Sequence, residues 1–563
     1  MKSGAMSLLG CVPLFLGSVA PVFGQTQFSL AQQAQPADPT GLPRNLTDEE
    51  RRYLELHPLV AGQNDMGGEF GLRGPYPAPT GTIRCPGEYE PCDGIIIAWK
   101  QFTPVLAQMG ALITNQGDAN LYVACDSTSV RNSAQSALTN AGADMSRVQF
   151  IITTTNTVWM RDYGPRYIYE GDVRAIIDHT YNRPRPNDDL FPNAFSTFKN
   201  HARYTLPLIH GGGNYHLNGL GDSWATRLIN NENPSLTEAQ IIAYWNQYQN
   251  VNTTLTQPFP TSVDLTQHID MWMQITGDNS AVIADWPSNV GSTQDNICDS
   301  TAAAMQSAGW TIARVPGRAI TGTHYTYTNV VMCNDIILIP SYSNATIVNA
   351  GHNAEALATW QAHMPGKQIH QLNCQSVVTS AGVMHCIVMH VPKHLGAEGA
   401  SGGLAPTAYL RNLRGGESLN PGETVPIRWL SDDDVSVSNI DILLSTDGGE
   451  TFPTVIAAAT APDGSHNWVV PDIYTQQASV RIVARDGVGN TGFDESPAAF
   501  AILGTPPPCP ADFDQNGTAE VPDIFAYLSA WFAQDSSADI DGTPGIGVPD
   551  IFAFLAIWFA GCD

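Results

Sequence analysis

Three separated motifs carry residues suited to one kind of chemistry. They hold a cysteine in an apolar run (Cys386), a histidine two residues before an aspartate (His268 and Asp270), and an aspartate directly after an arginine (Asp162). A thiolate attacks an electron-poor carbon, and an imidazolium protonates a leaving amine and then activates water. Carboxylates bind the planar fork of N–H donors of a guanidinium, which stays protonated at any physiological pH. Together these groups suit the hydrolysis of a guanidinium to a ureido group and ammonia.

The local sequence predicts where each group lies. Asp162 belongs to a Trp-x-Arg-Asp-x-Gly-Pro motif that follows a β-rich run, which predicts a strand end or turn. The alternation of His268 and Asp270 predicts that both side chains share one face of a strand. Asn329 leads into an apolar strand, and Cys386 lies within a strand-like run. Singly, such features are common in protein cores and on surfaces, and only their combination favours a site.

Length and composition limit the class of protein. A chain of 563 residues exceeds what one hydrophobic core usually organises, so several domains are expected. It has 53 acidic and 26 basic side chains and a formal charge of -27, which argues against binding nucleic acid through a positive field. Beyond the N-terminus, the sequence shows no apolar run of about 18 residues, so no membrane span is predicted.

The N-terminus resembles a secretory signal peptide, residues 1–24, which predicts a secreted or cell-surface protein. A lipoprotein-like box ends at Cys11, but too few residues precede it for a full hydrophobic region. Residues 25–75 are predicted to be an N-terminal extension with one helix that begins after Thr47, a good N-cap.

Export permits disulfide bonds, and removal of Cys11 leaves nine cysteines. Cys85 and Cys92 bracket a short loop, and Cys509 and Cys562 bracket the last module, so both are candidate pairs. The odd count leaves at least one cysteine without an intramolecular partner, and we expect Cys386 to be unpaired.

Composition shifts divide the rest of the chain. Residues 76–395 alternate short apolar β-rich runs with helical stretches, which indicates an α/β fold for the catalytic domain. A Gly/Ala/Ser-rich linker is predicted at 396–408. Short alternating strands with turn signals at 409–503 predict an immunoglobulin-like β-sandwich. Residues 504–563 begin with a second, proline-rich linker.

The last module contains an internal repeat of 27 residues. In the first copy, oxygen-bearing side chains stand at relative positions 1, 3, 5 and 12 with glycine at 6, a spacing typical of a calcium loop. It resembles a dockerin-type repeat pair, a small helical calcium-loop module. The second copy has Thr543 and Pro544 at positions 5 and 6, which weakens its prediction. The candidate ligands are Asp512, Asp514, Asn516, Asp523, Asp539, Asp541 and Asp550.

Over residues 80–392 the three motifs and the segment of Asn329 together resemble the guanidine-modifying superfamily, and within it the Porphyromonas-type peptidylarginine deiminases and the agmatine deiminases. The resemblance implies a five-bladed α/β propeller (pentein) and catalysis without a cofactor. It implies that Asp162 and Asp270 clamp the guanidinium, that His268 is the general acid and base, and that Cys386 is the nucleophile of a covalent thiouronium intermediate. It also implies that Asn329 completes the site. Trp159 and the pair Arg183 and Arg185 are counted with the substrate-binding residues.

Arg183 and Arg185 bear on the substrate. Prolines stiffen the backbone around them, and in the Porphyromonas-type enzymes the matching pair binds the carboxylate of a C-terminal arginine. The alternative is a basic turn neutralised locally by Asp188 and Asp189. Downstream, the run of glycines at 211–213 is predicted to be a backbone turn, since no Lys-Ser/Thr follows as in a phosphate loop.

The sequence therefore predicts a secreted deiminase of peptidylarginine that converts arginine to citrulline and prefers peptides ending in arginine; its partner is an arginine-containing peptide or a small guanidine compound. Agmatine deiminase is an alternative that differs only in substrate. A non-catalytic surface-binding protein, in which the sandwich and the calcium module bind a surface or protein partner, is an alternative of another class.

Overall fold

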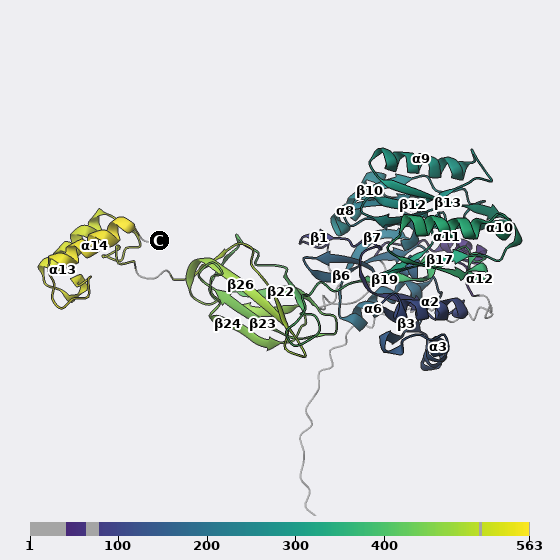
Figure 1. Ribbon diagram of the computed structural model, residues 1–563. Helices are drawn as coiled ribbons and strands as arrows, with labels where there is room; N and C mark the ends of the chain where they lie inside the picture. Colours follow the sequence, from purple (N-terminus) through teal and green to yellow (C-terminus); the bar gives the residue numbers. More distant parts are fainter. Residues whose placement is uncertain (1–40, 63–77, 506–508, 562–563) are drawn as a thin grey trace, which may run out of the picture. The chain divides into compact units, whose positions relative to one another are not determined.

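The computed structural model describes residues 41–62, 78–505 and 509–561 (Figure 1). The predicted signal peptide at 1–24 and the proline linker at 506–508 lie outside the described residues. In the described part of the chain, no helix has the length and apolar character that crossing a bilayer requires.

Five small sheets between residues 83 and 392 share one topology. In each, an antiparallel pair is followed by a strand that joins in parallel. In sheet order the strands are β19 (Met389–Pro392), β2 (Cys92–Ala98), β3 (Asn120–Cys125), β4 (Val148–Ile152); β1 (Ile83–Arg84), β5 (Arg166–Glu170), β6 (Val173–Tyr181), β7 (Ala202–His210); β8 (His216–Leu217), β9 (Asp222–Thr226), β10 (Asn252–Thr256); β11 (Met273–Gly277), β12 (Ser280–Asp285), β13 (Thr311–Pro316); and β16 (Val331–Cys333), β17 (Ile336–Ser341), β18 (Gln368–Asn373).

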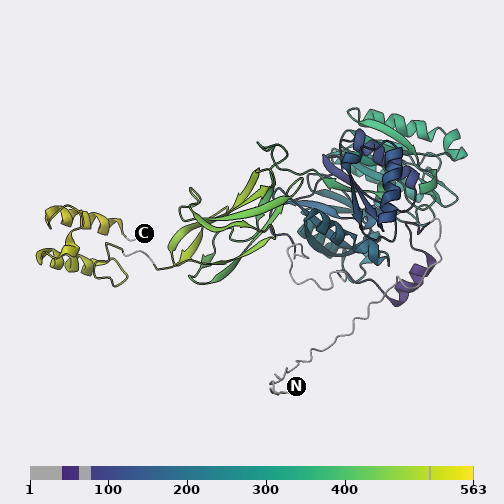
Figure 2. The same ribbon diagram turned by 90° about the horizontal axis from the view of Figure 1, so that it is seen from below.

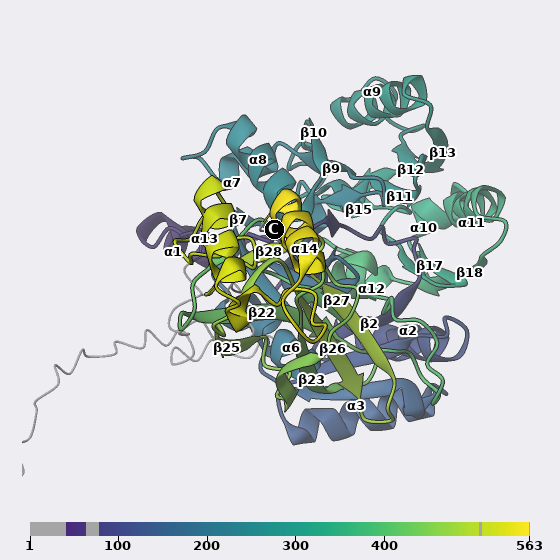
Figure 3. The same ribbon diagram turned by 90° about the vertical axis from the view of Figure 1, so that its left-hand side faces the viewer.

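Helices connect the parallel neighbours, because parallel strands need a long crossover. Figure 3 shows α3, α8, α9 and α11 at the margins of this region, with strands between them. The crossover helices are α2 (Thr103–Asn115), α3 (Thr128–Asn140), α6 (Phe191–Lys199), α7 (Leu228–Glu232), α8 (Glu238–Gln249), α9 (Thr293–Ser307), α10 (Ala345–Asn349) and α11 (His352–His363). A hairpin of β14 (Arg318–Ile320) and β15 (Thr323–Tyr325) follows β13. The mixed α/β fold expected from the sequence is thus confirmed.

The last strand of the region pairs with the first sheet. Met389 of β19 lies opposite Ile96 of β2 in an antiparallel ladder. Both side chains belong to the largest hydrophobic cluster of the molecule, so the pairing is fixed by burial as well as by hydrogen bonds. This contact joins the two ends of the α/β region.

Two helices show how local sequence sets element boundaries. The hydroxyl of Thr47 accepts from the Glu50 amide and Glu50 accepts in return from the Thr47 amide, so α1 (Asp48–Leu56) begins where the sequence predicts. Thr237 and Gln240 form the same reciprocal box at the start of α8. Such a cap satisfies amides that have no partner inside the helix.

Residues 407–503 form two packed sheets, antiparallel except for one short parallel pair between residues 418–419 and 501–502, around a core that includes Ile427, Trp429 and Ile482. The predicted turn at Asp447 lies between β23 and β24. The strands are β20 (Thr407–Leu410), β21 (Ser418–Leu419), β22 (Thr424–Asp432), β23 (Val437–Ser445), β24 (Thr454–Thr460), β25 (Ser465–Val469), β26 (Tyr474–Asp486), β27 (Thr491–Glu495) and β28 (Phe500–Leu503).

The C-terminal repeat forms two helices, α13 (Val521–Phe532) and α14 (Val548–Ala560), which lie side by side (Figure 2). The rings of Tyr527 and Phe554 stack between them, with centroids 4.1 Å apart. These residues occupy equivalent positions of the two repeat copies, which are 27 residues apart. Each copy thus supplies one helix to a small shared core.

The cysteines depart from one predicted pairing. Cys85 and Cys92 are both free thiols; Cys85 donates to the carbonyl of Gln249, and the sulfur of Cys92 lies 3.6 Å from that of Cys333. Each is buried among other partners, so the proposed Cys85–Cys92 pair was wrong. Cys509 is disulfide-bonded, as expected, while Cys562 lies outside the described residues.

Candidate functional site

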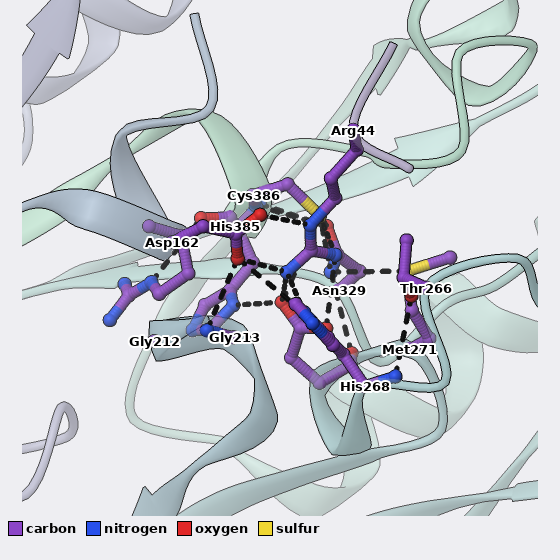
Figure 4. Close-up of polar contacts among 12 residues, drawn as sticks. Arg44, Asp162, Gly212, Gly213, Thr266, His268, Met271, Asn329, His385 and Cys386 are labelled. Atoms are coloured by element: carbon purple, nitrogen blue, oxygen red, sulfur yellow. Dashed lines mark hydrogen bonds and ion pairs between the residues drawn. The ribbon is translucent and has the colours of Figure 1, made fainter. Parts of the chain in front are cut away.

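The predicted site residues come from four segments that connect the sheets. Asp162 lies on α4 (Met160–Tyr163), a short helix in the loop between β4 and β5. Asn329 lies two residues before β16. His268 and Asp270 lie at η5 (Ile269–Met271), and Cys386 lies in η6 (His385–Ile387). The structure brings all five side chains together (Figure 4).

Two of the predicted local structures were wrong. His268 and Asp270 are not on a strand: His268 is extended and caps a short 3-10 turn that contains Asp270. Cys386 likewise lies in a 3-10 turn, and strand β19 begins three residues later. Alternation over three residues cannot distinguish a strand from an extended residue that enters a tight turn.

A fifth segment supplies the group that these residues bind. Arg44 reaches from the N-terminal part of the chain into the centre of the cluster (Figure 4). Asp162 accepts from its Nε at 2.8 Å and from its Nη2 at 2.7 Å. Asp270 accepts from Nη1 at 3.1 Å and from Nη2 at 2.9 Å. The two carboxylates therefore bind two edges of one guanidinium, each with both oxygens.

The two terminal nitrogens of the guanidinium also contact Cys386 and His268. The sulfur of Cys386 lies 2.6 Å from Nη1, and Nδ1 of His268 lies 2.9 Å from Nη2. Arg44, His268, Asp270 and Cys386 each have an exposed fraction of 0%, so the occupied site is closed to solvent. No outside molecule reaches Cys386 while Arg44 holds this position.

The burial of the site and the bound guanidinium together shift the pKa values of the two carboxylates. Burial raises the pKa of Asp162, but the Arg44 guanidinium and the His268 ring outweigh it and hold the pKa well below its usual range. Asp270 behaves in the same way, because burial is outweighed by Arg44 and His385, and its pKa is also lowered. Both carboxylates are thus anions that depend on a bound cation.

The Cys386 thiol responds in the opposite direction. Burial raises its pKa well above the usual value, and the two carboxylates add to the rise. The guanidinium of Arg44 is the main influence that lowers it. A guanidinium in the site therefore favours the thiolate form of Cys386, the form in which a cysteine is nucleophilic.

Asn329 fixes the turn that carries the cysteine. Its Oδ1 accepts from the backbone amide of His385 at 3.0 Å, and its Nδ2 donates to the sulfur of Cys386 at 3.1 Å. The amide of Val383 also donates to that sulfur, at 3.3 Å. These two donors favour negative charge on the sulfur, which supports the part predicted for Asn329.

Behind Asp270 lies a chain of buried and partly buried polar groups that the sequence did not reveal. Nδ1 of His385 lies 2.9 Å from Asp270 Oδ2, and its Nε2 lies 2.9 Å from Glu88. Glu88 in turn pairs with Arg161 at 2.6 Å. The chain holds the Asp270 carboxylate in place, so His385, Glu88 and Arg161 are positioning residues.

Glu88, His216 and His385 also offer ligand atoms within 4.8 Å of one another, as a metal site would. Glu88 and His385 are already bonded to each other, and Arg161 supplies a cation beside Glu88. Burial lowers the pKa of His216 to about 3, which keeps its ring neutral. The group is explained by this ion-pair chain without a metal.

The glycine run forms the floor under the guanidinium. It makes the turn η4 (Gly212–Asn214), as predicted, and the Gly213 amide donates to Asp162 at 3.2 Å. A Cβ atom at Gly213 would lie 1.8 Å from Nη2 of Arg44 and 2.8 Å from Asp270. Glycine is therefore required here by the close approach of the ligand.

The predicted substrate-binding residues contact the backbone around Arg44. Trp159 donates to the Leu42 carbonyl at 2.9 Å, and Arg183 donates to the Arg44 carbonyl at 3.2 Å. Arg185 donates to the Pro43 carbonyl at 2.8 Å and pairs with Glu50 at 2.7 Å.

Asp188 and Asp189, the alternative partners for the two arginines, accept hydrogen bonds from backbone amides. Asp188 accepts from Asn156 and Thr157, and Asp189 accepts from Tyr181 at 2.6 Å. Arg183 and Arg185 are thus turned toward the site, and they bind main-chain carbonyls on both sides of an arginine within the chain.

The predicted metal ligands gather in two groups in the tail. Asp512, Asp514 and Asp523 place oxygens within 4.8 Å of one another, and so do their counterparts Asp539, Asp541 and Asp550. Asn516 lies in the first loop, where its side chain accepts from the Thr518 amide at 3.0 Å. The spacing of the repeat therefore produces two clusters of carboxylates.

Sequence reasoning missed Arg44 and the chain behind Asp270. His385 was visible as the neighbour of Cys386, but a histidine in an apolar run carries no signal of what it faces. Arg44 lies in a stretch taken as an extension. The only available clue was the capped helix directly after it, which shows that the stretch is structured.

Replacing Gly213 with alanine tests the floor of the site. On the full chain with Arg44→Gln, which leaves the site free, we expect Gly213→Ala to lower kcat/KM for an added guanidinium compound by at least about 100-fold, because the new Cβ displaces the bound group from Cys386. Gly366→Ala is the matched control, since a Cβ there meets nothing within 4 Å. Ammonia release and thermal unfolding are measured together; equal activity in the two variants would contradict this geometry.

The chain is similar to a known family and to several known proteins. The family model of the Porphyromonas-type peptidyl-arginine deiminases matches residues 84–392, more than half of the chain. The agmatine deiminase of Ectopseudomonas mendocina is 24% identical over 306 residues, which cover 47% of this chain and 83% of that protein.

Two solved structures are similar as well. An agmatine deiminase of C. jejuni with substrate bound has a TM-score of 0.49 and 16% identity, and covers 56% of this chain and 97% of that one. The agmatine deiminase of Enterococcus faecalis has a TM-score of 0.48 and 17% identity, and covers 57% and 100%. On the family match, the chain belongs to the Porphyromonas-type peptidyl-arginine deiminases, hydrolases that act on carbon–nitrogen bonds of linear amidines.

Proposed function

We propose that this deiminase hydrolyses the guanidinium of arginine within peptides to the ureido group of citrulline and ammonia. The observation that carries the proposal is the bond from Arg183 to the Arg44 carbonyl. Agmatine has no atom at that position, whereas every peptidyl arginine does. In a peptide that ends in arginine, a carboxylate oxygen would take the same place.

The mechanism follows from the contacts of Arg44. Asp162 and Asp270 hold the guanidinium while the Cys386 thiolate adds to its central carbon. His268 faces Nη2 and protonates it, so ammonia leaves and a thiouronium forms on Cys386. Water, activated by the now neutral His268, adds to that carbon, and loss of the thiolate gives the ureido product. No cofactor enters any step.

Agmatine is the second candidate substrate, and the names of the relatives favour it. The similar proteins given above are agmatine deiminases of bacteria. The guanidinium clamp of Asp162 and Asp270 suits either compound, because it touches only the end of the side chain. The contacts that separate the two substrates are those of Arg183 and Arg185 with the backbone.

The remaining parts of the proposal concern the whole chain. The five sheets and the β19–β2 pairing support a five-bladed propeller over residues 76–395. The two packed sheets support an immunoglobulin-like sandwich, and the repeat supports a dockerin-type module that binds calcium and a surface or protein partner. Export through a signal peptide at 1–24 belongs to the same proposal.

The two carboxylate clusters of the tail offer the oxygen ligands that calcium prefers. A hard cation prefers oxygen ligands around a tight turn, and Gly517 adopts a φ of 96° in the first loop. Asp512, Asp514, Asn516 and Asp523 would hold the first ion, with Asp539, Asp541 and Asp550 as the counterparts in the second loop. Bound calcium would offset the repulsion among these carboxylates and stabilise the loops.

Replacement of the nucleophile tests the chemistry. Because Arg44 occupies the site of the native chain, the assay uses the full chain with Arg44→Gln. We expect added Cys386→Ser to reduce ammonia release from arginyl peptides by at least about 1000-fold, since a neutral hydroxyl is a far weaker nucleophile. The free thiol Cys298, replaced by serine, is the control. Ammonia release that is undiminished without the Cys386 thiol would contradict the mechanism.

Replacement of Arg183 tests whether the substrate is an arginyl peptide or agmatine. On the same Arg44→Gln chain, Arg183→Gln should lower kcat/KM for an arginyl peptide by about 10- to 100-fold, the value of a charge-assisted hydrogen bond. The Arg183→Gln substitution should leave the turnover of agmatine unchanged. Arg428→Gln, on the exposed side of β22, is the control and should change neither the turnover of the peptide nor that of agmatine. Better turnover of agmatine than of any peptide, with no effect of Arg183→Gln, would support the second candidate instead.

Addition and chelation of calcium test whether the C-terminal repeat binds this ion. Calcium should bind to the full chain with measurable heat and raise the unfolding temperature of the tail, and Asp523→Asn should abolish the stronger site. Asp535→Asn, in the tail but outside both loops, is the control. Ammonia release should not change on chelation. Absence of binding would refute the calcium loops, and loss of catalysis on chelation would contradict a tail-only role.

A further inference from the structure

The segment that fills the active site belongs to the chain itself, and it is seated as a substrate would be. The guanidinium of Arg44 makes every contact that the proposed reaction needs: both carboxylates, the cysteine sulfur and the histidine. An arginine that only blocked the site would not need Nη1 at 2.6 Å from the nucleophile. The geometry is that of an enzyme–substrate complex.

The backbone around Arg44 is held on both sides. Its amide donates to the Ser380 carbonyl at 3.1 Å, while Trp159 and Arg185 bind the two preceding carbonyls. Beyond it, α1 exposes most of its residues, and Glu50 is the buried one, paired with Arg185. Arg44 and Glu50 are therefore the two anchors of this segment.

We propose that Arg44 is a self-modification site: the enzyme deiminates it within its own chain, and conversion to citrulline releases residues 42–56 from the active site. The proposal rests on the deiminase function given above. Cys386 forms a carbon–sulfur bond to the guanidinium carbon, Nη2 leaves as ammonia with a proton from His268, and water breaks the carbon–sulfur bond. Water is the only co-reactant, and no redox change occurs.

The product cannot keep the contacts of the substrate. The ureido oxygen replaces Nη2, which lies 2.7 Å from an oxygen of Asp162 and 2.9 Å from an oxygen of Asp270. Three hydrogen-bond acceptors then face one another, and both carboxylates lose the cation that stabilised them. Citrulline at position 44 is therefore expelled, which opens Cys386 to outside substrates.

The raised pKa of Cys386 bears on the pH dependence of this step. Since the thiolate is the nucleophile and burial favours the neutral thiol, the thiolate fraction rises with pH. Conversion of Arg44 should therefore accelerate as pH increases. A freshly made chain would be closed and inactive toward outside substrates, and would open with time.

The test follows Arg44 by mass spectrometry in the full-length chain. A Glu-C digest avoids cleavage at arginine, and Arg51 and Arg52, exposed on α1, serve as nearby reference arginines. We expect the mass change of citrulline at Arg44 alone, with a first-order rate independent of protein concentration. The Cys386→Ala chain should keep arginine at position 44, even when mixed with the active enzyme.

Activity toward an added arginyl peptide supplies the second readout. The native chain should show a lag that parallels conversion of Arg44, whereas Arg44→Gln should show none. Arg44→Lys keeps the cation without a guanidinium and should stay at least about tenfold less active, because its open state is rare. Arg52→Gln is the matched control and should behave as the native chain does.

The outcomes separate the two proposals. If Arg44→Gln turns over added substrate while Arg44 of the native chain remains arginine, the deiminase function stands and self-modification is overturned. Conversion that depends on protein concentration, or that appears in the mixed Cys386→Ala chain, would also overturn it, because the reaction would then occur between molecules. If neither Arg44 nor any added guanidine is converted, the deiminase function itself fails.

Discussion

A guanidinium buried between two carboxylates is the interaction on which the active site depends. Asp162 and Asp270 are both buried, and each would be costly as an isolated anion in such surroundings. The guanidinium of Arg44 neutralises them through four hydrogen bonds and also favours the thiolate of Cys386. Recognition of the cation and activation of the nucleophile are thus one electrostatic effect.

The surrounding residues hold the side chains of the site in this arrangement. Gly213 leaves the room that the guanidinium occupies, and Asn329 holds the turn that carries the cysteine. His385 and Glu88 support Asp270 from behind. The tight turns at η5 and η6 differ from the strands expected there, because the side chains must converge on one point instead of lining a flat face.

The sequence alone predicts several of the residues in the candidate site and the boundaries of some helices. It does so where the cause is local in the chain. The identities of Asp162, His268, Asp270 and Cys386 followed from the chemistry that a guanidinium requires and from the resemblance. The capped starts of α1 and α8 followed from local hydrogen bonding that acts within four residues. The mixed α/β class followed from the periodicity of apolar residues.

What remained hidden depends on contacts between distant segments. Arg44 lies 118 residues from Asp162 and 342 from Cys386, and Glu88 lies 297 residues from His385. No local pattern marks either residue, because their roles arise only when the fold brings them to the site. The same holds for Arg183 and Arg185, whose partners in the structure are backbone carbonyls of the N-terminal segment.

The central claim is that the two carboxylates bind a cation of this shape against the sulfur of Cys386. Labelling of the Arg44→Gln chain with 2-chloroacetamidine, a small amidinium whose chloride a thiolate displaces, tests it most directly. Peptide mass spectrometry should find the adduct on Cys386 and not on the other six free cysteines of the described chain, and the rate should fall when Asp162 becomes asparagine. Labelling spread over other cysteines, or a rate indifferent to Asp162, would contradict the account.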